Sequence, residues 1–352
     1  MEKTKSLYCY FGELGLFEEN IPGHTFYQVG LLDAISEKYG NSNFDFYNYM
    51  DAKASSENRP NYPVGPLGQV FETFTNQLID DYRLGYEDVL LRISNREYNK
   101  IFLKARFRNL STLQKKLKDA QRFETFIKHA IACGYEPSDI IILDTDLSLS
   151  EQFLHTIAEL GITREIVSIS VPGIGTNFLN SCLEVHQHAE KPSTNKLMYY
   201  GNLSFDNYKE GHGKNPIIND IINSIDSVKL FNGAPFNLTV AAKSTPELDT
   251  WFSQLENVNF VARQHRAVIW EEFISSLVSI NVSKDLYLKE GFTPARVYES
   301  IIFGVIPVSY MVGQHPAMTF ETVDDLFEIC KFLTECSGAD YHKILRHCAM
   351  SL

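Results

Sequence analysis

The chain has 352 residues, which at roughly 100–200 residues per domain predicts two domains, each with its own hydrophobic core. Its hydrophobic fraction of 44% and charged fraction of 22% are typical of globular proteins and exclude a collagen-like or largely disordered chain. The formal net charge of −12 argues against a protein whose whole surface binds nucleic acid. No apolar run approaches the roughly 18 residues of a membrane-spanning helix, so we expect no membrane partner.

The N-terminal residues and the cysteines predict the location of the protein and its metal content. The first five residues lead into mixed polar and aromatic sequence without the apolar stretch of a secretory signal, which predicts a cytoplasmic protein. The six cysteines include no CxxC pair, so a zinc ribbon is not expected and reduced, mostly buried thiols are. We expect a monomer.

Strand and helix patterns alternate along the whole chain, which predicts an α/β fold with mainly parallel sheets. In the first half, strands are predicted over 7–11, 43–49, 89–93, 139–143 and 165–171. Helices are predicted there over 25–39, 67–82 and 113–133. Gly40 is suited to cap the first helix, and segment 51–68, with its prolines and glycines, predicts a long surface loop or flap.

A polar, proline-containing segment over 186–195 is predicted to be a linker, because a second series of strands and helices begins directly after it. Its strands are predicted over 196–202, 228–231, 258–261, 278–282 and 305–310, and its helices over 216–225, 245–255, 269–277 and 293–303. Two Rossmann-like domains facing across a cleft, a GT-B-like architecture, are therefore expected. We assign 1–190 to an N-terminal acceptor domain, 191–335 to a nucleotide-sugar domain, and 336–352 to a C-terminal helix packing back on the first domain.

The most informative segment runs from Glu290 to Val308. Thr293 can cap a helix whose first turn holds Pro294, and Arg296 and Glu299 share one face of that helix. Backbone N–H groups and a guanidinium at a helix start favour a diphosphate, and a Glu one turn later can accept two ribose hydroxyls. A surface ion pair on an ordinary helix is the alternative.

With the strand that follows, this segment resembles the nucleotide-sugar motif of GT-B glycosyltransferases. It is similar to the DNA β-glucosyltransferases and hydroxymethylcytosine sugar transferases of T-even-type phages, over about residues 196–335. The segment 199–204 resembles that family's strand and Gly/Ser turn, and 228–234 its next strand and glycine turn. The resemblance implies a donor site made of Gly201, Asn202, Ser204, Lys209, Gly233, Asp285, Arg296 and Glu299.

The chain departs from the family pattern at one place, and a second spacing separates it from other GT-B enzymes. The family's Gly/Ser turn carries arginines that hold the diphosphate, whereas this chain offers Lys209, His212 and Lys214 as substitutes. The spacing between Glu290 and Glu299 is off by one from the two-glutamate motif of many retaining GT-B enzymes, which favours the phage-type alignment.

The predicted buried strand over 139–143 runs into Asp144, Thr145 and Asp146. In the phage enzymes the corresponding strand ends in Thr-Asp, which implies that Asp146 is the general base that deprotonates the acceptor hydroxyl. A strand ending in Asp-x-Asp instead binds a divalent metal in GT-A enzymes, which would use Asp144 and Asp146. In a third, structural interpretation Asp144 is a turn residue and Asp146 a helix cap.

A basic run lies between Arg92 and Arg122, where ten basic residues face two acidic ones and aromatic residues are interleaved. This pattern predicts a local footprint for the phosphates of double-stranded DNA, with Arg96, Lys104, Arg106 and Arg108 as acceptor contacts. A solvated helix face is the alternative. Glu19 and His24 are further residues that could face the cleft, although a loop cap suits each of them.

The resemblance implies an enzyme that moves glucose or a pentose such as arabinose from a UDP-sugar to 5-hydroxymethylcytosine in phage DNA, by a single inverting displacement. UDP-sugar is the expected co-substrate, with no tightly bound cofactor and no required metal. A non-DNA acceptor stays open because of the net charge. A non-catalytic nucleotide- or DNA-binding phage protein is the alternative from another class.

Overall fold

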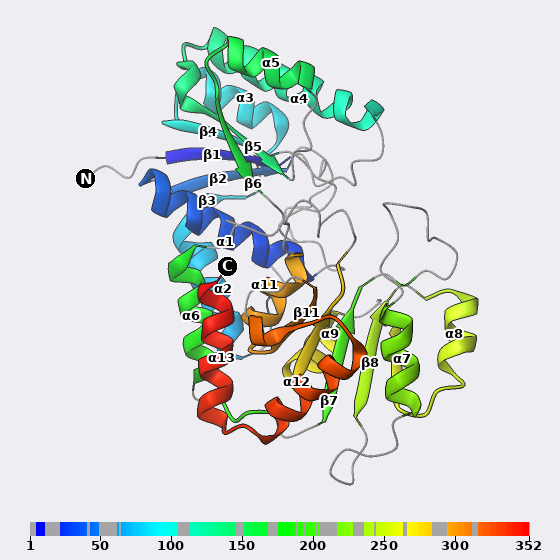
Figure 1. Cartoon of the computed structure of the whole chain (residues 1–352). Helices are drawn as coiled ribbons and strands as arrows, with labels where there is room; N and C mark the ends of the chain where they lie inside the picture. The colour runs from blue at the N-terminus through cyan, green and yellow to red at the C-terminus, as the bar shows by residue number, and fades with distance from the viewer. Residues whose placement is uncertain are drawn as a thin grey trace. The chain divides into compact units, whose positions relative to one another are not determined.

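We analysed a computed structural model of the chain. It describes residues 5–10, 22–40, 43–48, 62, 65–82, 84–104, 113–145, 151–167, 175–187, 189–192, 195–201, 203, 217–227, 236–242, 244–262, 266–283, 294–311 and 316–351. The chain divides into two compact units, Met1–Phe178 and Leu179–Leu352. Each unit contains one parallel sheet with helices on its faces (Figure 1).

The described strands of the first unit form a six-stranded sheet in the order β3-β2-β1-β4-β5-β6, in which every neighbouring pair is parallel. The strands are β1 (Lys5–Tyr10), β2 (Asn43–Asn48), β3 (Ile79–Asp81), β4 (Lys100–Lys104), β5 (Ile140–Thr145) and β6 (Thr163–Val167). The helices are α1 (Pro22–Tyr39), α2 (Pro66–Leu78), α3 (Tyr86–Ser94), α4 (Leu113–Ala132), the 3-10 turn η1 (Pro137–Asp139) and α5 (Glu151–Glu159).

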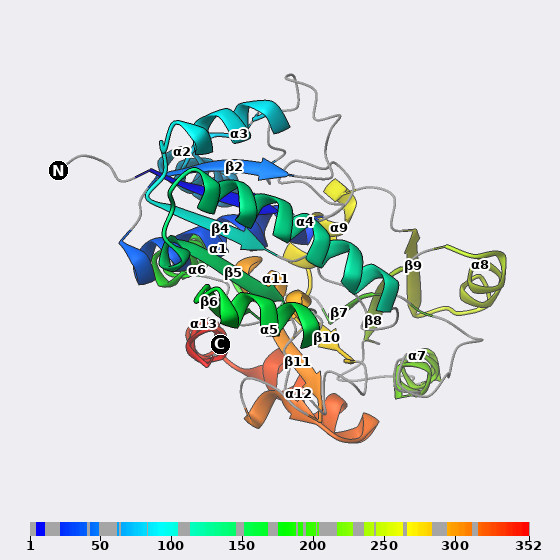
Figure 2. The same cartoon turned by 90° about the horizontal axis from the view of Figure 1, so that it is seen from above.

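Alternating side chains divide the core of this unit between the two faces of its sheet. On β1, Leu7 and Cys9 pack with residues of α3, α4 and α5, whereas Tyr8 and Tyr10 pack with residues of α1 and α2 on the other face. Figure 2 looks onto the face that α3, α4 and α5 cover. Strands buried on both faces need continuous apolar sequence, which is why β1 and β5 were recognisable as runs rather than alternations.

The second unit repeats the topology. Its described strands form a sheet in the order β12-β11-β10-β7-β8-β9, again with parallel neighbours throughout. The strands are β7 (Lys196–Tyr200), β8 (Asn237–Ala242), β9 (Val258–Ala262), β10 (Val278–Asn281), β11 (Ile306–Tyr310) and β12 (Thr319–Phe320). The helices are α6 (Thr176–Gln187), α7 (Ile217–Ser227), α8 (Pro246–Phe252), α9 (Arg266–Ile274), α11 (Ala295–Ile302), the 3-10 turn η2 (Pro316–Met318), α12 (Val323–Glu335) and α13 (Gly338–Met350).

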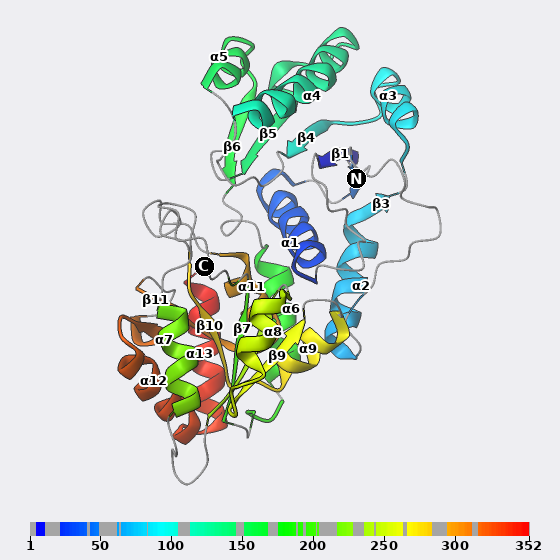
Figure 3. The same cartoon turned by 90° about the vertical axis from the view of Figure 1, so that its right-hand side faces the viewer.

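Figure 3 shows α7 and α12 on one side of the second sheet and α9 on the other. Numbered within its own unit, each sheet has the strand order 3-2-1-4-5-6 of the doubly wound Rossmann fold. The predicted α/β class and the two Rossmann-like units that a GT-B fold requires are therefore confirmed by the sheets themselves.

Contacts at the two ends of α6 explain where the chain divides. In its first turn, the N–H of Phe178 donates to Asp33 (2.8 Å) and that of Asn177 to Glu37 (3.0 Å), which ties the turn to α1 of the first unit. Beyond the helix, Lys191 Nζ donates to the carbonyls of Leu333, Thr334 and Cys336 at the end of α12, at 2.7–3.0 Å. The sequence placed the boundary at residue 190, whereas the division falls between Phe178 and Leu179, within α6.

The C-terminal helix belongs to the second unit. Tyr341, Leu345 and Cys348 of α13 lie in the main hydrophobic core of that unit. The hydroxyl of Tyr341 donates to the carbonyl of Leu277 at 2.8 Å, just before β10. Its buried side chains thus complete the core of the second unit, and packing of 336–352 on the first domain stays a prediction.

Two predicted elements in the first half are wrong. Residues 89–93 are part of helix α3 rather than a strand, because Val89 and Ile93 are one helical turn apart and are the buried residues of that helix. The strand of this region is β4, and its pattern was not recognised in the sequence because a lysine stands at each end of its apolar residues. The helix predicted over 67–82 ends at Leu78, and the next three residues form β3. The predicted strand 228–231 and residues 51–61 of the loop predicted over 51–68 lie outside the described residues, whereas the end of that loop, from Pro66 onward, is the start of α2.

Candidate functional site

The strand order of the second unit fixes where a ligand can bind. Neighbouring strands β10 and β7 are continued in opposite directions, β10 toward β11 and β7 toward β8, so the sheet has its topological switch point between them. Ligands of open parallel sheets bind beyond the carboxyl ends of the strands at such a point. Here those ends carry Tyr200 and Gly201 from β7 and Asn281 from β10.

Helix α11 starts at the same edge, because it follows β10 in the chain and precedes β11. We expected Thr293 to cap it, but Pro294 occupies the N-cap position with extended backbone and without a side-chain cap hydrogen bond. Pro294 therefore supplies the first N–H groups of α11 with no side-chain acceptor of the kind that Ser, Thr, Asp or Asn offers at this position. Arg296 and Glu299 lie in the first and second turns, as predicted, with Arg296 partly exposed and Glu299 8% exposed.

Arg296 is held from beneath by a tyrosine of β7. The guanidinium hydrogen bonds to the hydroxyl of Tyr199, a side chain that is fully buried in the hydrophobic core. Burial raises the pKa of Tyr199 to about 12, and the positive charge of Arg296 acts in the opposite direction. Among the described residues, Nη1 of the same guanidinium is buried and has no hydrogen-bond partner. One nitrogen of Arg296 is thus fixed, while Nη1 makes no hydrogen bond to any described residue.

Two further polar atoms near this edge were missed by the sequence analysis. Asn281 ends β10 and is 1% exposed; its amide nitrogen donates to the Ser279 carbonyl at 3.2 Å, while its Oδ1 has no partner among the described residues. The hydroxyl of Tyr298 on α11 is also buried without one. Buried polar groups are normally satisfied, so such atoms are informative. The sequence signal for Asn281 was an amide residue placed between the apolar Ile280 and Val282.

Of the predicted donor residues, Gly201, Arg296 and Glu299 are described, and all three lie at this carboxyl edge or on the helix that starts there. The N–H of Gly201 donates to the Ala241 carbonyl at 3.0 Å, which continues the pairing of β7 with β8. The remaining predicted donor residues lie outside the described part of the chain: Asn202, Ser204, Lys209, Gly233 and Asp285.

In the first unit, Asp144 is the penultimate residue of β5, so the strand runs two residues beyond the predicted range of 139–143. The carboxylate of Asp144 is fully buried and accepts two hydrogen bonds from Arg164 of β6, at 2.6 and 3.1 Å. An ion pair in the interior gives Asp144 a structural role and disfavours its use as a metal ligand. Within the described residues, no group of three or more His, Cys, Asp or Glu side chains could hold a metal ion. Asp146 lies just outside those residues.

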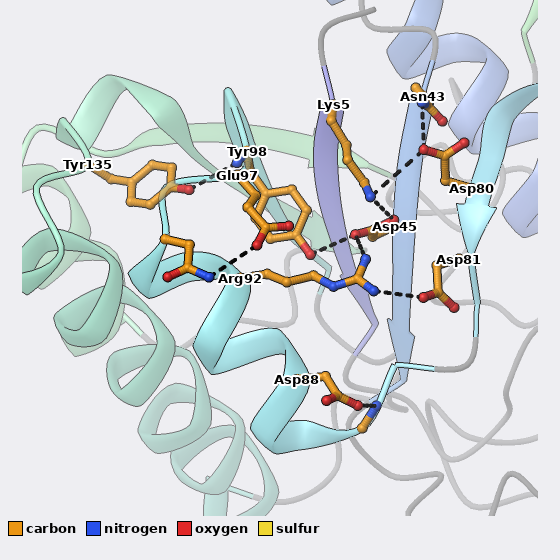
Figure 4. A network of polar contacts seen from close by, with 12 residues as sticks. Lys5, Asn43, Asp45, Asp80, Asp81, Asp88, Arg92, Glu97, Tyr98 and Tyr135 are labelled. Carbon is orange, nitrogen blue, oxygen red and sulfur yellow. Dashed lines mark hydrogen bonds and ion pairs between the residues drawn. The ribbon is translucent and has the colours of Figure 1, made fainter.

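Arg92, at the start of the basic run, takes part in a network of ion pairs and hydrogen bonds within the first unit. Arg92 lies 2.6 Å from Asp45 and 2.9 Å from Asp81, and Asp45 also accepts the hydroxyl of Tyr98 (2.8 Å) and pairs with Lys5 (2.9 Å), as Figure 4 shows. Asp45 is the third residue of β2, so this network lies in the amino half of the sheet, away from the carboxyl edge where ligands bind.

Two of the four predicted DNA contacts are described. Lys104 is only 2% exposed, with Nζ 5.4 Å from the centre of the Tyr10 ring, so its assignment to an exposed phosphate contact is wrong. The period-2 alternation of β4 turns Lys104 into the core face. Arg96 is exposed, has a left-handed backbone (φ 57°) and places its guanidinium over the Tyr135 ring at 5.7 Å. Arg106 and Arg108 lie outside the described residues, as does Glu19. His24 falls in the first turn of α1 rather than in a turn before it.

No family model matches the sequence, and no curated protein is detectably similar to it. Several solved structures are similar in fold. T4 phage β-glucosyltransferase in complex with UDP-glucose has 10% identity and a TM-score of 0.43, covering 99% of this chain and 96% of that one. E. coli heptosyltransferase WaaC with ADP has 6% identity and a TM-score of 0.41, covering 93% and 99%.

A putative UDP-N-acetylglucosamine 2-epimerase from Listeria monocytogenes is also similar, with 10% identity, a TM-score of 0.42, and coverage of 97% of this chain and 90% of that one. We therefore argue the function of this protein from its own residues. Within its described segments, no helix is both long and apolar enough to cross a membrane.

Proposed function

We propose that the protein is a glycosyltransferase that takes its sugar from a UDP-sugar bound at the carboxyl edge of the second unit's sheet. The observation that supports this most is Arg296. Its guanidinium lies at the start of α11, hydrogen bonds to the buried Tyr199, and retains a buried nitrogen that has no partner among the described residues. A guanidinium beside the N-terminal N–H groups of a helix is suited to a diphosphate. Glu299, one turn later on α11, is assigned to the ribose hydroxyls.

Under this proposal the reaction is a single displacement. The acceptor hydroxyl attacks the anomeric carbon, the bond from that carbon to the diphosphate breaks, and UDP leaves with the electron pair. Asp146, directly after β5, takes the proton of the attacking hydroxyl. Arg296 offsets the charge that develops on the leaving diphosphate. One displacement inverts the configuration of the anomeric carbon.

For the acceptor we propose 5-hydroxymethylcytosine in DNA, on the strength of the motif order over 196–335. The burial of Lys104 and the ion pairs of Arg92 within the first unit favour a second candidate, a non-DNA acceptor, because they remove charge from the expected footprint. Glucose and a pentose are both retained as candidate sugars.

The test combines binding with transfer. Calorimetry with UDP, and with ADP as the matched control, should show a clear preference for UDP. Mass spectrometry should then show addition of a sugar to duplex DNA containing 5-hydroxymethylcytosine when UDP-glucose or UDP-arabinose is supplied, and none to the same duplex containing 5-methylcytosine. Binding of UDP without transfer to the DNA would direct the search to other acceptors. Failure to bind any nucleotide would refute the proposal.

A further inference from the structure

We propose that Tyr199 is a positioning residue for the donor diphosphate: its buried hydroxyl holds the guanidinium of Arg296 so that Nη1 faces the ligand. This inference rests on the function proposed above and adds a role for a strand residue that touches no substrate.

The position of Tyr199 makes a purely packing role insufficient. It is the penultimate residue of β7, pairs with Ile280 of β10 across the switch point, and is fully buried among apolar side chains. A hydroxyl in such surroundings is unfavourable unless it is hydrogen bonded, and phenylalanine would fill nearly the same volume without that requirement. The hydroxyl does have a partner, the guanidinium of Arg296.

The nitrogens of the Arg296 guanidinium can bond to Tyr199 and to a ligand at the same time. A guanidinium carries five N–H donors in a rigid plane and accepts none, so Tyr199 must be the acceptor of this hydrogen bond. Fixing one nitrogen of a planar group orients the others, and Nη1 is buried with no hydrogen-bond partner in the described part of the chain. Arg296 is therefore ordered before the ligand arrives, and less rotamer freedom is lost on binding.

The substitution Tyr199→Phe tests this role, with calorimetric titration of UDP and of uridine as paired readouts. Because Arg296 contacts the diphosphate, we expect affinity for UDP to fall by about five- to tenfold, the effect of one ordinary hydrogen bond, while affinity for uridine stays the same. If the substitution instead disturbed the fold, the affinities for UDP and for uridine would fall by the same factor. In an Arg296→Ala background, Tyr199→Phe should cause no further loss.

The matched control is Tyr341→Phe. Tyr341 is also a fully buried tyrosine of the second unit, but its hydroxyl bonds to the backbone of Leu277 and Ile306. We expect that variant to lower the melting temperature and to leave the ratio of UDP to uridine affinity unchanged. An equal loss for both ligands in Tyr199→Phe, or none for UDP, would overturn the inference.

A second variant keeps the test decisive if Tyr199→Phe does not fold. Arg296→Lys retains the charge but not the planar fork, so it should lose nearly as much UDP affinity as Arg296→Ala. Wild-type affinity in Arg296→Lys would show that no oriented guanidinium is needed and would overturn the inference while leaving the proposed function in place. If the unmodified protein binds no UDP, the proposed function fails, and the inference fails with it.

Discussion

Asp45 and Arg92, 47 residues apart in the chain, form an ion pair inside the first unit, with Arg92 Nη1 2.6 Å from a carboxylate that is fully buried. Arg92 also reaches Asp81 on the neighbouring strand β3, so one side chain of α3 fastens the helix to two strands. The carboxylate of Asp45 further raises the pKa of Tyr98, together with burial, which acts more strongly. Arg92 belongs to the basic run that predicted a DNA footprint, but in the structure its side chain holds α3 against the sheet.

We expect Arg92→Met to lower the free energy of unfolding by about 3 kcal/mol, because it leaves a buried carboxylate with only part of its compensation. Lys5 still faces Asp45 and limits the loss. Urea denaturation followed by circular dichroism measures this. The control is Lys128→Met, which removes an exposed pair with Glu124 on α4 and should cost less than about 0.5 kcal/mol. Equal decreases in the free energy of unfolding of the two variants would contradict a structural role for the pair of Arg92 with Asp45.

His186 predicts a pH dependence of stability. Its Nε2 donates to the Ile302 carbonyl at 2.7 Å, and burial holds its pKa below the ordinary value of 6.5, with nearby His342 acting in the same direction. Below pH 6.5 the unfolded chain therefore binds a proton at this site that the folded chain does not. Stability should fall as the pH falls from about 6.5, until the folded state takes up the proton as well.

Thermal unfolding at a series of pH values between 5 and 8 checks this, with His186→Gln as the comparison. The variant should lose the slope near pH 6.5, because glutamine does not titrate. An unchanged slope in His186→Gln would assign the pH dependence to another group.

Arg296→Ala and Glu299→Ala should each weaken UDP binding by about ten- to a hundredfold, the effect of removing a charged hydrogen-bond partner worth roughly 1.5–3 kcal/mol. The fold should persist, which near-native melting curves would confirm. Because Glu299 is assigned to the ribose, Glu299→Ala should also weaken the binding of uridine, whereas Arg296→Ala should leave uridine binding unchanged. Unchanged UDP affinity in both variants would remove the donor site from α11.

Asp146 and Asp144 should respond differently to the same conservative change. Asp146→Asn removes basicity at the proposed proton acceptor, so turnover should fall by about 10²–10⁴ with UDP affinity nearly unchanged. Asp144→Asn breaks the buried pair with Arg164 and should mainly lower the melting temperature. If a metal bound both residues, each variant would weaken donor binding and a chelator would abolish turnover. Near-normal turnover in Asp146→Asn would reject the base assignment.

Charge reversal at Arg106 and Arg108 tests the DNA acceptor. If these residues contact phosphates, Arg106→Glu with Arg108→Glu should weaken DNA binding and reduce its dependence on salt, while UDP affinity stays constant. The control is the variant Arg92→Met. The side chain of Arg92 is paired with Asp45 and Asp81, so this variant should leave the salt dependence of DNA binding unchanged. Identical DNA affinity and salt slope before and after reversal would make the run a solvated surface.

The sequence by itself determined the alternation of strands and helices, the two Rossmann-like units, and the placement of Arg296 and Glu299 on one helix after β10. These features depend on local periodicity and on chain order, which are properties of neighbouring residues. The same local information failed at 89–93, because a short apolar run fits a strand and a helix equally well until its packing partners are known.

Only the tertiary structure decided what the charged and polar side chains do. The sequence shows that Arg92, Lys104 and Arg296 are cations, but not that the first is paired with Asp45, the second buried beside Tyr10, and the third held by Tyr199. Each of these partners lies on a strand that is distant in the sequence: Asp45 on β2, Tyr10 on β1 and Tyr199 on β7. The free energy of a buried charge depends on those distant partners, so it is settled by the fold and not by the segment that carries the charge.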